Sequence, residues 1–101
     1  MLKKIGKYEI IEELGHGGQA QMYKAEDMSL PGRLVALKTT ILADNSKSRM
    51  DYLRLKREAQ VLGLLNHPQI AQLFEFGEDT KIKIAYMARQ YLEGNTLAEH
   101  L

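Results

Sequence analysis

A single segment of the chain has the periodicity of a long helix, and segments with the pattern of β-strands lie on both sides of it. The helical segment begins near Ser48, and its apolar residues recur at spacings of three and four. These residues are Leu55, Ala59, Leu62 and Leu65, which share one face of a helix. A lone helix has no second helix to cover that face, so it must pack on a sheet. The pattern therefore predicts an α+β fold.

Two local signals set the ends of this helix. Ser48 and Asp51 have the spacing of a capping box, in which a side-chain acceptor precedes an acidic residue by three positions. We therefore expect the helix to begin at Ser48. His67 and Pro68 follow its last leucine. The residue before a proline avoids helical backbone angles, so the helix must end before His67.

Five segments have the apolar and β-branched pattern of strands. They span residues 8–14, 21–25, 33–41, 70–76 and 81–92. Polar or glycine-containing turns separate them, and one such turn is predicted at residues 77–80. We expect a five-stranded antiparallel sheet with one main helix on a face, preceded by an N-terminal tail at residues 1–7. Thr96 is a candidate cap for a final helix from Leu97, which would be present only as a C-terminal helix stub.

The composition places the chain among small globular domains. It has 101 residues, of which 45% are hydrophobic, enough for one core. Its 14 basic and 13 acidic residues give a formal charge of +1, which argues against electrostatic binding of nucleic acid or anionic lipid. It has no cysteine, so disulfides, thiolate metal sites and a cysteine nucleophile are excluded. No apolar run approaches the roughly 20 residues of a membrane span, and we expect a soluble cytoplasmic protein.

A glycine cluster separates the first two predicted strands. Gly15, Gly17 and Gly18 would let the backbone approach a ligand and direct several N–H groups at an anion such as a phosphate chain. The alternative is that these glycines only serve a tight turn. Two other phosphate-binding motifs do not fit, because a strand rather than a helix follows the glycines and no Gly-Lys-Ser/Thr triplet is present.

Lys38 lies in the middle of an otherwise apolar strand, where it follows Val35, Ala36 and Leu37. An unpaired buried ammonium group is costly, so Lys38 must either meet an anion or extend its amine to solvent. Glu58 lies on the predicted helix, off its apolar stripe, and could pair with Lys38. The alternative for Glu58 is an ordinary solvated charge.

In this order, the segments resemble the N-terminal lobe of a protein kinase, most closely the eukaryotic-like serine/threonine kinases of bacteria. Residues 14–22 resemble the glycine-rich loop of that family, residues 35–38 its Val-Ala-Ile-Lys strand, and Glu58 its helix-C glutamate. Residues 67–70 resemble its His-Pro-Asn-Ile, and residues 90–94 its hinge. The resemblance implies that residues 8–101 are the N-terminal lobe of a kinase domain without the C-terminal lobe.

The resemblance also implies a site for ATP. Lys38 would hold the α- and β-phosphates, and Glu58 would orient Lys38 through an ion pair. The glycine-rich loop would cover the phosphates, three apolar residues would contact the adenine from above, and the hinge backbone and a threonine would contact the adenine edge and the ribose. The implied residues are Leu14, Gly15, His16, Gly17, Gly18, Ala20, Met22, Ala36, Gln90, Leu92 and Thr96. Leu62 and Leu73 would belong to the hydrophobic spine of active kinases.

Five positions depart from the family's pattern. Gln19 lies at the loop tip, Ala20 replaces the third loop glycine, Met22 replaces a valine, and Gln90 replaces the hinge glutamate. Arg89 falls at the gatekeeper position, where the family has an apolar residue or threonine. A buried arginine is costly unless it is paired, so either Arg89 finds an acid or solvent, or the alignment is shifted by one residue.

The 101 residues contain neither the His-Arg-Asp nor the Asp-Phe-Gly motif of the family. By the family's pattern they therefore supply no catalytic base and no magnesium ligand, although magnesium is implied with ATP. We expect the ATP-binding lobe of a serine/threonine protein kinase, inactive by itself, with a protein substrate in the longer form. The alternative is a non-catalytic, pseudokinase-like interaction module, and self-association is expected through the apolar surface that a second lobe would cover. A third possibility is a small α+β domain whose motifs are coincidental.

Overall fold

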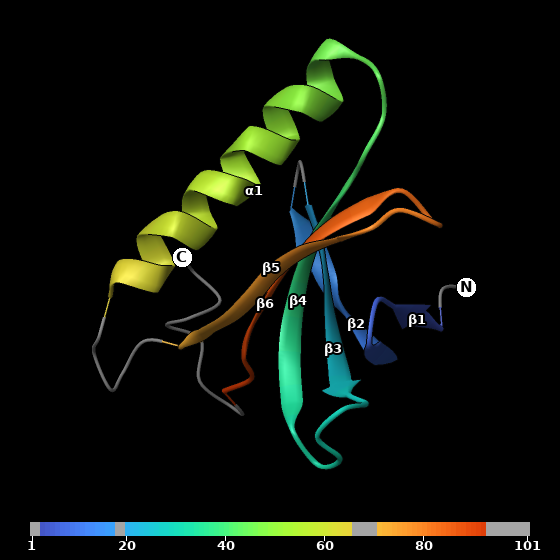
Figure 1. The fold of residues 1–101 in the computed structure, drawn as a ribbon, viewed down its shortest axis with the longest axis vertical. Helices are drawn as coiled ribbons and strands as arrows, with labels where there is room; N and C mark the ends of the chain where they lie inside the picture. The colour runs from blue at the N-terminus through green and yellow to red at the C-terminus, as the bar shows by residue number, and fades with distance from the viewer. Residues whose placement is uncertain (1–2, 18–19, 66–70, 93–101) are drawn as a thin grey trace.

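The computed structural model describes residues 3–17, 20–65 and 71–92, which form one antiparallel sheet with one helix beside it (Figure 1). The elements in chain order are β1 (Lys4–Ile5), β2 (Tyr8–Gly17), β3 (Ala20–Asp27), β4 (Leu34–Ile41), α1 (Ser46–Leu64), β5 (Leu73–Asp79) and β6 (Ile84–Gln90). The strand order in the sheet is β1-β2-β3-β4-β6-β5. The predicted α+β class is therefore confirmed.

The sheet has six strands, so the prediction of five was wrong. The additional strand, β1, lies in the segment that we expected to be a tail. Ile5 pairs with Tyr8 across a turn at Gly6, whose φ is +55°, and the Ile5 side chain is fully buried. Two residues are too few to show the alternation by which strands are detected in a sequence.

The predicted hairpin around the glycine cluster is present. Strands β2 and β3 pair along their length as far as Gly17 and Ala20, and two bulges interrupt β2. One of the bulges lies between Glu13 and Gly15. Strand β4 lies between β3 and β6, so both of its edges are hydrogen-bonded.

The turn between β5 and β6 lies at residues 80–83, three positions later than predicted. Gly77 is inside β5, opposite Tyr86. A Cβ atom on Gly77 would lie 2.7 Å from the Tyr86 hydroxyl oxygen, so this glycine admits a tyrosine ring rather than forming a turn. The positive φ that the turn requires is taken by Lys83, at 56°.

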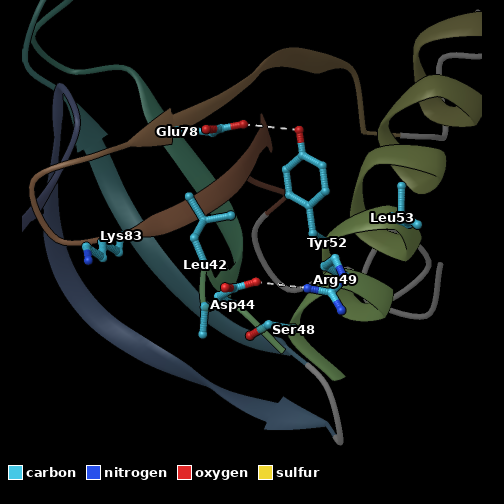
Figure 2. A pocket seen from close by; sticks show the side chains of 9 residues that line it. Leu42, Asp44, Ser48, Arg49, Tyr52, Leu53, Glu78 and Lys83 are labelled. Atoms are coloured by element: carbon cyan, nitrogen blue, oxygen red, sulfur yellow. Dashed lines mark hydrogen bonds and ion pairs between the residues drawn. The ribbon is translucent and has the colours of Figure 1, made fainter. Parts of the chain in front are cut away.

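Helix α1 begins two residues before the predicted start. The Asn45 side chain caps it by accepting a hydrogen bond from the Ser48 N–H at 2.8 Å. Asp44, just before the cap, forms an ion pair with Arg49 at 3.0 Å (Figure 2). The helix ends at Leu64, ahead of Pro68 as expected. The final helix expected from residue 97 lies outside the described residues. Within the described ranges, no helix is long and apolar enough to span a membrane.

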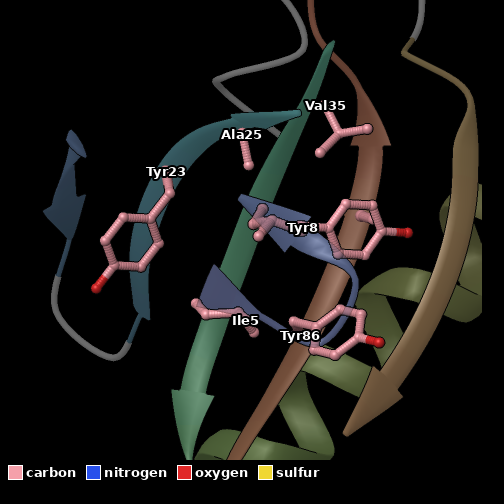
Figure 3. Packing of buried hydrophobic residues seen from close by; sticks show 8 residues of the cluster. Ile5, Tyr8, Tyr23, Ala25, Val35 and Tyr86 are labelled. Atoms are coloured by element: carbon pink, nitrogen blue, oxygen red, sulfur yellow. The ribbon is translucent and has the colours of Figure 1, made fainter. Parts of the chain in front are cut away.

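The core consists of two clusters, one on each face of the sheet. The helix-side cluster contains Leu55, Ala59, Leu62, Ala85 and Met87. The second cluster contains Ile5, Tyr8, Tyr23, Ala25, Val35, Leu37, Tyr86 and Ala88 (Figure 3). The rings of Tyr8 and Tyr86 meet edge to face, with centroids 5.6 Å apart, although their strands are not neighbours in the sheet. The sheet must therefore curl so that its first strands cover its own inner face.

Asp79 connects the turn at Gly6 to the turn between β5 and β6. Its Oδ2 accepts a hydrogen bond from the Gly6 N–H at 2.8 Å, and its Oδ1 accepts one from the Lys81 N–H at 3.1 Å. The bond from the Gly6 backbone is the main reason that the pKa of Asp79 lies below its ordinary value. The ionised carboxylate thus stabilises the curled sheet.

We expect Gly77→Ala to lower the free energy of unfolding by about 1–3 kcal/mol, because the new methyl group would displace the Tyr86 ring. Urea denaturation measures this change. Gly63→Ala is the matched control, since its Cβ would meet only the flexible tip of Leu73, at 3.3 Å. Equal losses in the two variants would contradict the proposed role of Gly77.

The lowered pKa of Asp79 also predicts a pH dependence. A depressed carboxyl pKa stabilises the fold above the unfolded value of about 3.9, and this stabilisation is lost as the pH falls through the lower folded value. We expect Asp79→Ala to destabilise the chain by about 1–3 kcal/mol near neutral pH and by clearly less near about pH 3. Asp44→Ala, at a fully exposed position, should change little. A deficit that is the same at both pH values would contradict this account.

Candidate functional site

Lys38 lies at the centre of the sheet, in a row of residues that crosses four strands. Gly15 on β2 pairs with Met22 on β3, Met22 pairs with Lys38 on β4, and Lys38 pairs with Met87 on β6. Met87 belongs to the helix-side cluster, so the pairing row shows that Lys38 extends its side chain toward α1. The pairing therefore brings the glycine-rich turn and the lysine to neighbouring places on one sheet.

Lys38 and Glu58 form an ion pair. The Nζ of Lys38 lies 2.7 Å from Oε1 of Glu58, and the two side chains are only 23% and 24% exposed. The predicted pairing is confirmed, and neither a free edge lysine nor a solvated glutamate describes what is found. Oε2 of Glu58 is buried and has no hydrogen-bond partner among the described residues, so this carboxylate can accept a further donor.

The glycine-rich turn is constrained at Gly15. Its φ is +110°, a conformation that side chains rarely adopt, and a Cβ atom there would meet nothing within 4 Å. The requirement for glycine is therefore one of backbone conformation rather than space. Gly17 pairs with Ala20 at the end of the hairpin, and His16 pairs with Gln21. Gly18 lies outside the described residues.

The three residues expected to contact an adenine from above lie close to Lys38 along the strands. Met22 is directly opposite Lys38, and Ala36 lies two residues before it on β4, on the same face. Leu14 is in the bulge beside Gly15. Ala36 is buried, whereas Leu14 and Met22 are half-buried, so an apolar surface surrounds the lysine.

The predicted hinge begins where β6 ends. Gln90 is the last residue of β6, and its N–H donates a hydrogen bond to the Gln72 carbonyl at 2.8 Å. A ligand at this position would therefore have to use another group of Gln90, such as its carbonyl oxygen. Leu92 follows, half-buried, and Thr96 lies outside the described residues.

Arg89 is buried, with 2% of its surface exposed, and lies opposite Ala36 in the sheet. Its Nη2 is 3.9 Å from the sulfur of Met22. The side chain therefore lies within the apolar surface around Lys38. Because Arg89 is buried, exposure to solvent is not how its charge is accommodated.

Two features of this region were not anticipated. The Lys24 ammonium lies 4.8 Å from the centre of the Tyr91 ring, which attaches the predicted hinge to β3 through a cation–π contact. Met87 lies directly opposite Lys38 in the sheet. No sequence signal reports either contact, because both depend on which strands pair.

Leu62 and Leu73, the two expected spine residues, pack in the helix-side cluster.

Comparison with known proteins agrees with these features. No protein-family model matches the chain. It is 42% identical over 98 residues to a probable serine/threonine-protein kinase of Streptomyces coelicolor, and 38% identical over 96 residues to the serine/threonine-protein kinase PrkC of Bacillus subtilis. Each match covers 95% of this chain and 14% of the relative. The solved structure of PpkA-294 in its apo form matches with a TM-score of 0.70 and 26% identity, over 95% of this chain and 39% of that one.

The chain is homologous to the N-terminal lobe of bacterial serine/threonine protein kinases. The resemblance drawn from the motifs is thereby confirmed. This kinase lobe accounts for a small part of the length of its curated relatives. The α+β fold with one helix on the sheet is that of the family.

We expect the Lys38–Glu58 ion pair to contribute little to the free energy of unfolding, because both side chains remain about one quarter exposed. A double-mutant cycle with Lys38→Met and Glu58→Gln should give a coupling free energy of about 0.5–1 kcal/mol. Denaturant unfolding of the four proteins measures it. A coupling free energy indistinguishable from zero would contradict the predicted contribution of the contact. A second cycle, which pairs Lys38→Met with Asp44→Asn, is the control, and no coupling is expected for it.

Proposed function

We propose that the chain binds ATP at the site formed by the glycine-rich turn, Lys38 and the start of the hinge. The observation that carries the proposal is the Lys38–Glu58 pair at 2.7 Å beside a glycine turn on the same row of the sheet. An ammonium group has three donors, and Glu58 engages Lys38 from the side of the helix. The remaining donors suit the oxygens of a phosphate chain.

Within this proposal each part of the site has one task. Glu58 holds the Lys38 amine in place, and Lys38 neutralises and orients the α- and β-phosphates. The backbone from Gly15 to Ala20 covers the phosphates. Leu14, Met22 and Ala36 exclude water above the adenine, and the Gln90 and Leu92 backbone contacts the adenine edge, with Thr96 near the ribose. These last three tasks rest on the homology of the chain.

ATP would supply the phosphoryl group that a protein kinase transfers to a serine or threonine. This chain's own residues bind and orient, and among the described residues no group of three histidine or acidic side chains could hold a metal ion. We therefore assign no magnesium ligand to the chain. The 101 residues contain neither the His-Arg-Asp motif nor the Asp-Phe-Gly motif. We therefore propose that they bind nucleotide but do not transfer phosphate by themselves.

A second candidate function is a non-catalytic interaction module. The observation that favours it is Arg89, whose buried side chain contacts Met22 and lies beside Ala36, where the adenine would have to pack. A large cation in this place competes with the nucleotide for space and adds charge near Lys38. Such a module would bind a partner, or a second copy, through the apolar surface around the hinge.

Titration calorimetry with Mg-ATP separates the two candidates. If the chain binds ATP, we expect Lys38→Met to weaken binding by about tenfold or more, since it removes a charge-assisted contact, and Lys56→Met on the outer face of α1 to leave it unchanged. Arg89→Met should tighten binding, because it removes the competing side chain. If neither the chain nor its Arg89→Met variant binds, the proposed ATP site of this chain is wrong and the interaction module is favoured.

A further inference from the structure

The outer side of α1 carries an exposed apolar stripe. Met50, Leu53, Val61 and Leu64 are 51%, 57%, 52% and 86% exposed. At 100° per residue they fall within about a quarter of the helix circumference, on the side opposite Leu55 and the other residues that pack on the sheet. Such a stripe on an otherwise polar helix face is typical of a surface that pairs with another helix.

The charges of α1 are divided between its two sides. The helix contains five basic residues, all exposed: Lys47, Arg49, Arg54, Lys56 and Arg57. Its two acidic residues lie toward the sheet, where Asp51 is buried and bonded to Lys47 and Glu58 is bonded to Lys38. The outer side of α1 is therefore cationic, although the whole chain carries a formal charge of only +1.

The basic residues lie along both margins of the apolar stripe. By helical geometry Lys47 and Arg54 flank one margin, Arg49 and Lys56 flank the other, and Arg57 lies in the middle of the stripe. Three of them have acidic neighbours on this chain, since Lys47 is bonded to Asp51, Arg49 contacts Asp44 and Arg54 approaches Asp51. Arg57 and Lys56 form no ion pair with any residue of the described ranges.

This pattern selects the occupant of the surface. Two copies of α1 packed together, in either orientation, would place cations against cations, which disfavours self-pairing. A lipid surface would have to take up Arg57 from the centre of the apolar stripe, and a charge among acyl chains is costly. A helix with acidic margins and an apolar stripe meets both requirements. Its acids would face the basic margins, its apolar residues would cover Leu53 and Leu64, and the long side chain of Arg57 can extend its charge to an acid at the margin.

A hollow of about 590 Å³ adjoins the stripe on its Arg49 margin (Figure 2). Its lining residues are Leu42, Ala43, Asp44, Ser48, Arg49, Tyr52, Leu53, Glu78 and Lys83. The Tyr52 hydroxyl donates to Glu78 at 3.1 Å, which fixes the ring as one wall. Arg49 and Lys83 approach the hollow from opposite sides. The hollow can therefore receive a large apolar side chain that is followed by an acid.

We propose that the outer face of α1, defined by the apolar stripe and its basic margins, binds an acidic amphipathic helix of a partner protein, with one large apolar side chain in the adjoining hollow. This surface is separate from the Lys38–Glu58 pair, which lies on the sheet side of the same helix. The inference does not depend on nucleotide binding.

The test uses a fluorescent synthetic helix of about three heptads, with leucine at the a and d positions and glutamate at e and g. Anisotropy is measured on titration with the 101-residue chain. We expect saturable binding that weakens as salt is raised, and weak or no binding of a peptide of the same design with lysine at e and g. Equal binding of the two peptides would overturn the proposal. So would tighter binding to vesicles of phosphatidylcholine and phosphatidylglycerol than to the acidic peptide.

Variants of exposed residues locate the binding surface without disturbing the core. Leu53→Ser and Arg54→Glu should each weaken binding of the acidic peptide by about tenfold. Met28→Ser is the control, because Met28 is 48% exposed but lies away from α1. Circular dichroism confirms that each variant is folded. Undiminished binding by Leu53→Ser, or an equal loss in Met28→Ser, would show that the peptide does not occupy this face.

Discussion

Lys38 introduces an ammonium group into the central strand of the sheet, and α1 has to supply the carboxylate that makes this tolerable. Strand β4 is paired on both edges and covered on both faces, so its one charged side chain has little access to water. The burial of Leu55, Ala59 and Leu62 sets which side of α1 faces the sheet. The same helical rotation brings Glu58 within 2.7 Å of Lys38.

The charges of α1 follow from this arrangement. Glu58 meets Lys38 of the sheet, whereas Asp51 is buried and bonded to Lys47 of the helix itself. The basic residues are left on the outside, along an apolar stripe that nothing in the described residues covers. One helix thus presents two different chemical surfaces: an apolar one that packs on the sheet and carries Glu58 to Lys38, and a cationic one suited to an acidic helix.

Most of the fold and the key contact of the site could be predicted from the sequence, since they depend on periodicity and on the cost of burying charge. The helix, the glycine hairpin and the Lys38–Glu58 pair were all anticipated. The features that were missed depend on tertiary structure. Strand β1 is too short to show a period, Gly77 admits the Tyr86 ring instead of forming a turn, and Asn45 rather than Ser48 caps the helix. The contact of Arg89 with Met22 depends on the order of the strands, which local patterns do not specify.

The central claim is that this chain by itself brings Lys38 and Glu58 together. Zero-length carbodiimide cross-linking followed by peptide mass spectrometry tests it most directly, since the reagent joins only an amine and a carboxylate in contact. We expect an amide link between Lys38 and Glu58, which are 2.7 Å apart. Lys7 and Glu75, 3.9 Å apart and partly exposed, provide an internal control. Formation of the Lys7–Glu75 link without the Lys38–Glu58 link would contradict the account.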